Sequence, residues 1–186
     1  MKKKINELVQ MHTGVYAKPQ LEGEVYYIQA RHFDKNREFL ASVKPDLPGD
    51  MKREKHYLTV GDVIVASKGY DHFAVAYKGV IKPAVASSMF IVLRIEKANM
   101  LLPDFLAWFI NHSSTQNILL ANSKGTSLPS ISKVDIGNLE ISIPLISQQQ
   151  SIIKIQSLQK QAIGIQKQIG ALKEQYIQQL ILNTLK

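Results

Sequence analysis

Three carboxylates near residue 50 are the side chains that come closest to a catalytic metal site. Asp46 and Asp50 precede the adjacent pair Glu54–Lys55. A Mg²⁺-dependent nuclease holds its metal with paired carboxylates and places a lysine nearby. Here the glutamate and the lysine are adjacent rather than separated by one residue, and the polar segment around them predicts a loop instead of strands. We therefore expect no metal site and no nuclease chemistry.

The signatures of other catalytic sites are also missing. No glycine-rich loop follows a strand as in dinucleotide or S-adenosylmethionine sites, and the sequence lacks the Asn/Asp-Pro-Pro-aromatic tetrapeptide of amino-methyltransferases. No Gly-x-Ser-x-Gly nucleophile motif occurs. The histidines lack the i, i+4 spacing of a metal site, so we expect surface or hydrogen-bonding roles for His12, His32, His56, His72 and His112. The chain is predicted to be non-catalytic and to bind no cofactor itself.

Side chains suited to nucleic acid gather in three predicted loops. The net charge of +8 and the pI of about 9.6 favour a polyanionic partner. In the polar segment 32–57 and in the loop after residue 66, the candidate DNA contacts are Lys52, Arg53, Lys55, Lys68, Tyr70 and His72. In the glycine-bearing loop 123–127, the candidate phosphate contacts are Lys124, Thr126 and Ser127. A solvated surface is the alternative for each residue.

These loops need a folded scaffold, and the sequence predicts a mixed one. Runs of β-branched and aromatic residues predict strands over residues 24–31, 63–66, 73–77, 83–95 and 139–143. The run 89–95 is apolar on both faces, which indicates a central, buried strand. Pro103 opens a helix, and a second helix and a short helical turn follow over 115–121 and 130–135; residues 5–16 fit either a short helix or a strand. The predicted fold class is a mixed α/β (α+β) domain over residues 1–146.

Residues 147–186 predict one long helix with an apolar seam. Pro144 ends the preceding strand, and Ser147 with Gln150 predicts a capping box at the start of the helix. The spacings along the seam alternate between three and four residues, which is the a/d pattern of a coiled coil. The seam residues, which we expect to form a dimerisation helix, are Ile155, Leu158, Ala162, Ile165, Ile169, Leu172 and Tyr176.

The flanks of this seam permit pairing with a second copy of the chain. Glutamine dominates the e and g positions, so identical helices meet little like-charge repulsion, and charge does not decide their orientation. Packing of the seam on the chain's own domain is the alternative. Further apolar residues lie off the seam and predict a second contact surface: Ile152, Ile163, Ile177, Leu180 and Ile181.

Composition predicts a cytoplasmic protein without a membrane segment. The sequence has no cysteine, which excludes disulfides and thiolate metal sites and fits a reducing compartment. The basic start Met1-Lys-Lys-Lys lacks the apolar core of a signal peptide. No apolar run approaches the 18 to 20 residues, roughly, of a membrane span.

Short motifs follow one another in a recognisable order along the chain. They are Tyr26-Tyr-Ile28, Leu58-x-x-Gly61-Asp62-Val-Ile64, Ala86-Ser-Ser88 before Phe90-Ile-Val-Leu93, Leu102-Pro-x-Phe105-Leu106, Gly125, Ile131-Ser132 and Leu139-x-Ile141-x-Ile143-Pro144. Gln149 and Ile152 then follow Pro144 at the start of the long helix. In this order the chain resembles the DNA-specificity (S) subunit of Type I restriction–modification systems, in a half-size form with a single target recognition domain.

The resemblance implies a division of roles between the two regions. Residues 1–146 would be the target recognition domain that reads half of a split site in double-stranded DNA, and 147–186 the spacer helix. Two copies paired antiparallel would read an inverted repeat with a fixed gap. Separate modification subunits would bind S-adenosylmethionine and methylate adenine, with a restriction subunit as a further partner. The alternatives are a stand-alone S-like fragment that alters or blocks specificity, or a DNA-modifying enzyme with an unrecognised site.

Overall fold

The computed structural model of the 186-residue chain describes all residues except 35–36, 41–42, 50, 70, 126–127 and 185–186, and the side chains of 51–53. The chain divides into two compact units, residues 1–146 (unit 1) and 147–186 (unit 2). Unit 1 carries the sheets and the short helices, and unit 2 is helical. Each unit is described by itself below.

Unit 1 is built on a four-stranded antiparallel sheet with the order β2-β7-β4-β5. Its strands are β2 (Val9–Thr13), β4 (Val63–Ala66), β5 (Ala74–Ala76) and β7 (Phe90–Ile95). β7 lies between β2 and β4, and its first four residues are buried. The predicted central strand is therefore confirmed, and β4 and β5 form an antiparallel hairpin.

Two smaller sheets complete unit 1. β1 (Lys2–Lys4) pairs antiparallel with β8 (Glu140–Ser142), and β3 (Tyr26–Ile28) pairs parallel with β6 (Ala84–Ala86). The prediction of one continuous strand over 83–95 is wrong. The Ser87 amide donates to the Ile28 carbonyl and the Phe90 amide to the Ser87 carbonyl, which makes a turn between β6 and β7. The chain changes sheets at this turn, because β6 pairs with β3 whereas β7 pairs with β2 and β4.

Short helices connect these strands. They are the 3₁₀ turns η1 (Ile5–Glu7), η2 (Ala30–His32) and η3 (Met51–His56) and the α-helices α1 (Pro103–Asn111), α2 (Ser113–Asn122) and α3 (Lys133–Gly137). α1 starts with proline at its first turn, as predicted, and packs against β5 and β4.

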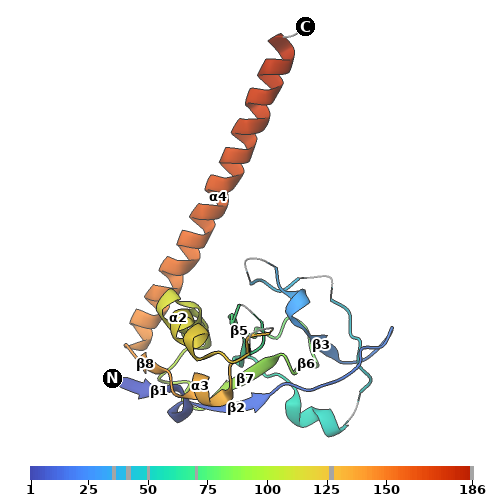
Figure 1. Ribbon diagram of the computed structural model, residues 1–186, viewed down its shortest axis with the longest axis vertical. Coiled ribbons are helices and arrows are strands. Elements are labelled where there is room, and N and C mark those ends of the chain that lie inside the picture. The colour runs from blue at the N-terminus through green and yellow to red at the C-terminus, as the bar shows by residue number, and fades with distance from the viewer. Residues whose placement is uncertain (35–36, 41–42, 50, 70, 126–127, 185–186) are drawn as a thin grey trace. The chain divides into compact units, whose positions relative to one another are not determined.

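The predicted strand over 24–31 is shorter than expected because η2 ends it. The segment 5–16 contains both a 3₁₀ turn and a strand. In Figure 1 the β3–β6 pair lies toward one end of unit 1, and α2 and α3 lie toward the other.

Phe90 belongs to a buried hydrophobic cluster of unit 1. It is fully buried and meets Phe33 and Phe73 edge to face, with ring centroids 6.0 Å from each. Ile64 and Ala66 of β4 and Val92 of β7 join the same cluster. Each fully buried side chain of this kind contributes about 1.5–3 kcal/mol relative to an exposed one, so this cluster holds β4, β6 and β7 in the positions from which the loops extend.

Unit 2 is the helix α4, which runs over Ile146–Thr184. Its 39 residues give a length of about 58 Å. Because the helix begins at Ile146, Ser147 is already helical and is not the capping residue that the sequence predicts. The larger side chains of the apolar seam are all exposed, from 47% for Ile169 to 65% for Ile155 and Tyr176.

Among the described residues, no helix has both the length and the apolar character that crossing a bilayer requires.

Candidate nucleic-acid interface

Two of the three predicted DNA-contacting loops meet at Ser130. Backbone bridges join Lys68 to Ser130 and Lys124 to Ser130. The Lys124 and Ser130 amides each donate to the other residue's carbonyl at 2.9 Å, and the Gly69 amide donates to the Pro129 carbonyl at 2.8 Å. The segments 67–72 and 123–130, named the loop pair here, therefore form one hydrogen-bonded surface on which both lysines are exposed.

Glycine is required at one turn in each segment of the loop pair. Gly69 has φ = +112° and Gly125 has φ = +97°, in the left-handed region that other residues enter at a cost. A Cβ atom on Gly125 would also lie 3.1 Å from the Leu128 carbonyl oxygen. The two glycines thus allow each segment to turn sharply next to its lysine.

His72 does not lie at the loop tip, and the structure corrects that prediction. Its side chain is fully buried, and Nδ1 donates to the Ala66 carbonyl at 3.1 Å. Gln116 on α2 donates to the His72 carbonyl at 3.0 Å. A buried imidazole in this position supports the loop from beneath and does not reach a ligand outside the protein. His72 lies two residues before Ala74, the buried first residue of β5, and side chains two residues apart on an extended chain point to the same side.

Arg37 is a supporting residue that sequence reasoning missed. It has φ = +64°, its Nη1 donates to Asn111 Oδ1 at 2.7 Å, and its Nη2 donates to Asp71 Oδ1 at 3.0 Å. Asn111 at the end of α1 also bonds the backbone of Ala74 through its oxygen and its nitrogen. Arg37 therefore ties the segment after η2 to the hairpin loop. No local pattern signals this contact, since its partners are 34 and 74 residues away.

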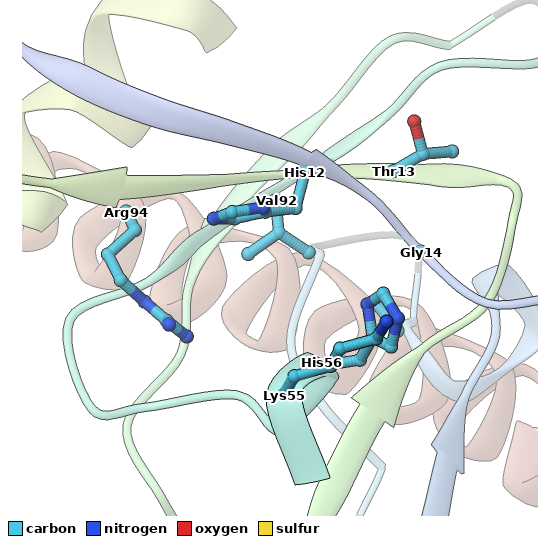
Figure 2. Close-up of a pocket in the computed structure, with 8 residues that line it drawn as sticks. His12, Thr13, Gly14, Lys55, His56, Val92 and Arg94 are labelled. Carbon is cyan, nitrogen blue, oxygen red and sulfur yellow. The ribbon is translucent and has the colours of Figure 1, made fainter. Parts of the chain in front are cut away.

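Lys55 lies in a different place, at a pocket between η3 and the four-stranded sheet. The pocket is lined by His12, Thr13, Gly14, Lys55, His56, Ala86, Val92 and Arg94. Figure 2 shows the side chains of His56 and Arg94 pointing into the space between β2 and η3, with Lys55 at its edge. The structure thus brings Lys68 and Lys124 together but leaves Lys55 apart from them. The predicted side chains of Lys52 and Arg53, and residues Tyr70, Thr126 and Ser127, lie outside the described part of the chain.

A buried ion pair fixes one wall of this pocket. Asp62 is 1% exposed and accepts two hydrogen bonds from Arg94, from Nε at 2.9 Å and from Nη2 at 2.7 Å. Hydrogen bonding to Asp62 raises the pKa of Arg94, so its charge is permanent. Asp62 also accepts from the Thr59 amide, and Arg94 Nη2 donates to the Tyr57 carbonyl. The pair joins the turn before β4 to β7.

The imidazole of His56 sits in positive surroundings. Its pKa is lowered first by burial and then by the charges of Lys55 and His12. The described residues include no group of three His, Asp or Glu side chains that could hold a metal ion. The loop pair and the pocket offer ammonium, guanidinium, imidazole and backbone N–H groups, so their chemistry is the binding of anions and of hydrogen-bond acceptors.

The family model described as "Type I restriction modification DNA specificity domain" matches residues 1–174. Among solved structures, the HsdS subunit from Thermoanaerobacter tengcongensis has a TM-score of 0.66 and 20% identity, over 90% of this chain and 44% of that one. The S subunit from M. genitalium gives 0.59 and 17%, over 85% and 38%.

A chain from the structure described as "Structural basis underlying complex assembly and conformational transition of the type I R-M system" gives a TM-score of 0.68 and 20% identity, over 90% and 44%. The present chain thus spans about two fifths of the length of these proteins, and at this identity the likeness establishes the fold. No curated protein matches the chain in sequence.

Proposed function

The chain belongs to the family of Type I restriction modification DNA specificity domains, and we propose from this that it is the DNA-reading, non-catalytic subunit of a restriction–modification complex. The observation that carries the proposal is the extent of the family match, which runs through unit 1 and into α4. Unit 1 supports it by presenting two loops with exposed cationic side chains on a hydrogen-bonded backbone.

In this proposal the loop pair contacts the DNA duplex. Contacts to phosphates fix the position of a protein on DNA, whereas contacts to base edges determine sequence preference. Lys68 follows a central strand and extends from the sheet, which suits a base-reading role. Lys124, with Thr126 and Ser127, suits phosphate contact beside Gly125. Backbone hydrogen bonds at Lys124, Ser130 and Gly69 hold the described parts of the two segments together before DNA arrives, which reduces the ordering cost of binding there.

We further propose that α4 pairs with the same helix of a second copy. The exposed seam supports this, because a contiguous row of exposed isoleucine and leucine side chains is unfavourable in water. In an antiparallel pair, residues at a positions face residues at d positions. The d residue Leu158 would therefore face the a residue Ile169 of the second copy or, if the register is shifted by one heptad, its a residue Tyr176. Two units related by a two-fold axis would read an inverted repeat with a fixed gap.

The expected partners are DNA, the second copy and the modification subunits, with a restriction subunit as a further member. The modification subunits would bind S-adenosylmethionine and transfer its methyl group to adenine. The off-seam residues Ile163, Ile177, Leu180 and Ile181 are between 46% and 55% exposed and are the proposed dock for these subunits. The role of this chain is to place the methyltransferase on its site.

The test is to select DNA with the chain together with its modification subunits. Randomised duplexes recovered by the complex should be enriched in a split, symmetric sequence. Enrichment of a single uninterrupted half-site would contradict the two-fold arrangement, and the absence of any enrichment would contradict the specificity function itself. Methylation of adenine within the selected site, dependent on this chain, would link the selection to catalysis by the partner.

Cysteine substitution tests the helix orientation cleanly, since the sequence contains no cysteine. In an antiparallel pair, Leu158→Cys alone should not cross-link on oxidation, because its two copies lie far apart along the axis. Mixing Leu158→Cys with Ile169→Cys, or with Tyr176→Cys, should give a cross-link in one of the two mixtures. Efficient cross-linking of Leu158→Cys with itself would show a parallel pair and would contradict the proposed geometry.

A further inference from the structure

The pocket beside Lys55 gathers nitrogen-bearing side chains from three elements that are distant in sequence. His12 comes from β2, Lys55 and His56 from η3, and Arg94 from β7. Figure 2 shows these side chains around one space, whereas the Thr13 side chain points away from it. The register of the sheet explains part of the grouping, because His12 lies opposite Val92 and Gln10 opposite Arg94 on adjacent strands. His12 and Arg94 are therefore on the same face.

Among the described residues that line the pocket, none is acidic. Asp62 is the nearest carboxylate to Arg94, and it is already engaged by that guanidinium and by the Thr59 amide. The acidic residues of the same elements, Glu54 on η3 and Glu96 after β7, do not line it. Arg94 still has Nη1 available, since only its Nε and Nη2 donate within the described structure. The pocket is thus rich in donors and poor in acceptors.

We propose that this pocket binds one phosphate group of the DNA backbone, held by the side chains of Lys55, Arg94, His12 and His56. The proposal rests on the DNA-reading function and adds a second contact point to it, separate from the loop pair. A phosphate fits the donor set, because its oxygens accept several charge-assisted hydrogen bonds at once. The rigid Arg94–Asp62 pair keeps one donor in place before the phosphate arrives.

Binding at this pocket takes up protons. In the free protein the pKa of His56 lies below 6.5, because burial and the charges of Lys55 and His12 disfavour its protonated form. A phosphate beside the ring favours the protonated form and raises that pKa. By linkage, the affinity for DNA rises as pH falls. The groups that face His56 here are His12 and Lys55, whose charges lower its pKa, and Arg94, whose charge is paired with that of Asp62.

The experiment measures binding of the full chain to a fluorescent duplex at several salt concentrations, at pH 6 and at pH 8. Each added phosphate contact steepens the plot of log Kobs against log salt by about one. For the wild type we expect the slope at pH 6 to be steeper by about one to two than at pH 8. The double variant His12→Gln/His56→Gln should lose that pH difference, and Lys55→Gln should lower the slope by about one at both pH values. Lys167→Gln on α4 is the charge-matched control and should keep the pH difference.

The outcomes separate this proposal from the function on which it rests. A wild type that binds the duplex with the same pH dependence as the double histidine variant overturns the pocket and leaves the DNA-reading function standing. A wild type that binds no duplex at low salt, even together with its modification subunits, overturns both. Inorganic phosphate, titrated while the histidine Cε1–H signals are followed by NMR, gives a further readout. Shifts of two histidines with phosphate, without any effect of the substitutions on DNA binding, would assign the pocket to a free anion and overturn the DNA contact.

Discussion

The apolar side chains of unit 1 and of α4 have opposite environments. Phe90, Ile64 and Leu93 in unit 1 are at most 1% exposed, whereas Ile155, Leu172 and Tyr176 on α4 are 65%, 63% and 65% exposed. Unit 1 therefore buries these side chains in its own core, whereas α4 exposes its apolar side chains, which can pack against another surface. The first region gains stability from its own packing, and the second would gain it from association.

The largest expected effect is on the mass of the chain in solution. Light scattering should give a mass of about twice the 20.9 kDa of one chain, and a chain truncated before Ser147 should be monomeric. The physical reason is that truncation removes the whole exposed seam, whereas the core of unit 1 is left unchanged. Unit 1 should therefore keep a cooperative thermal transition.

Point variants on α4 provide the matched control for this truncation. Ile165→Asp puts a charge on the seam and should also give a monomer. Lys167→Asp, two residues along on the polar side of the helix, should remain a dimer. A wild type that stays monomeric at micromolar concentration, or a truncated chain that stays dimeric, would show that the exposed seam of α4 does not mediate dimerisation.

Phe90→Ala is expected to have the largest effect on folding of unit 1 among single substitutions. It should lower the free energy of unfolding by about 3–5 kcal/mol, through lost transfer energy and the cavity left between Phe33 and Phe73. Chemical denaturation of the truncated chain measures this without contributions from association. Ile155→Ala in the full chain should leave that unfolding unchanged while weakening the dimer. A comparable loss of unit 1 stability with Ile155→Ala would mean that α4 contributes to the same core.

Arg94→Gln should be the next most destabilising change. It leaves the carboxylate of Asp62, which is 1% exposed, with only the Thr59 amide as a partner. Breaking a buried pair in this way costs about 3–5 kcal/mol, and the partial exposure of Arg94 reduces this to about 2–3 kcal/mol. Asp62→Asn combined with Arg94→Gln should recover part of the loss, because no unpaired charge is then buried. If the double variant is less stable than Arg94→Gln, the ion pair is not the cause.

The elements that the sequence predicts well are those with strong local patterns. β4 is a continuous apolar run that lies where the sequence predicts it, α1 starts at the predicted Pro103, and the seam of α4 has one clear period. β7 occupies only the second half of the strand predicted over 83–95. The loop at 67–72 and the loop at 123–127 could also be predicted, because glycine marks their turns. That the two loops meet at Ser130 could not, since this depends on pairing between segments about 60 residues apart.

Contacts between distant segments account for the remaining differences. The break between β6 and β7 follows from the partner of each strand. Ser87 and Ser88 lie at this break, but they do not show that the two strands belong to different sheets. The burial of His72 and the Arg37 contacts arise from packing around α1 and its last residue, Asn111. The pocket formed by His12, His56 and Arg94 joins three elements, and considering each histidine alone gave no reason to group them. Local sequence predicts which residues are polar, but the topology decides which of them meet.

The smallest expected effect tests whether local capping in unit 1 is independent of α4. Ser132 and Asp135 cap α3 reciprocally: the Ser132 amide and hydroxyl donate to Asp135 Oδ2 at 2.7 and 2.6 Å, and the Asp135 amide donates to Ser132 Oγ at 3.2 Å. Ser132→Ala should lower the stability of unit 1 by about 1 kcal/mol, without altering the mass of the chain. The hydrogen bonds from Ser132 lower the pKa of Asp135.

A carboxylate whose pKa is lower in the folded state than in the unfolded state stabilises the fold above its unfolded pKa, and this stabilisation is lost as pH falls through the folded value. The difference in unfolding free energy between wild type and Ser132→Ala should therefore be constant from pH 7 to about pH 5 and shrink below about pH 4. Ser151→Ala, which removes a hydroxyl bonded to the Ser147 carbonyl on α4, should show no such pH-dependent difference in the unfolding of unit 1. A constant difference down to pH 2 would assign the effect of Ser132→Ala to helix propensity alone, because the charge of Asp135 would then take no part in holding α3.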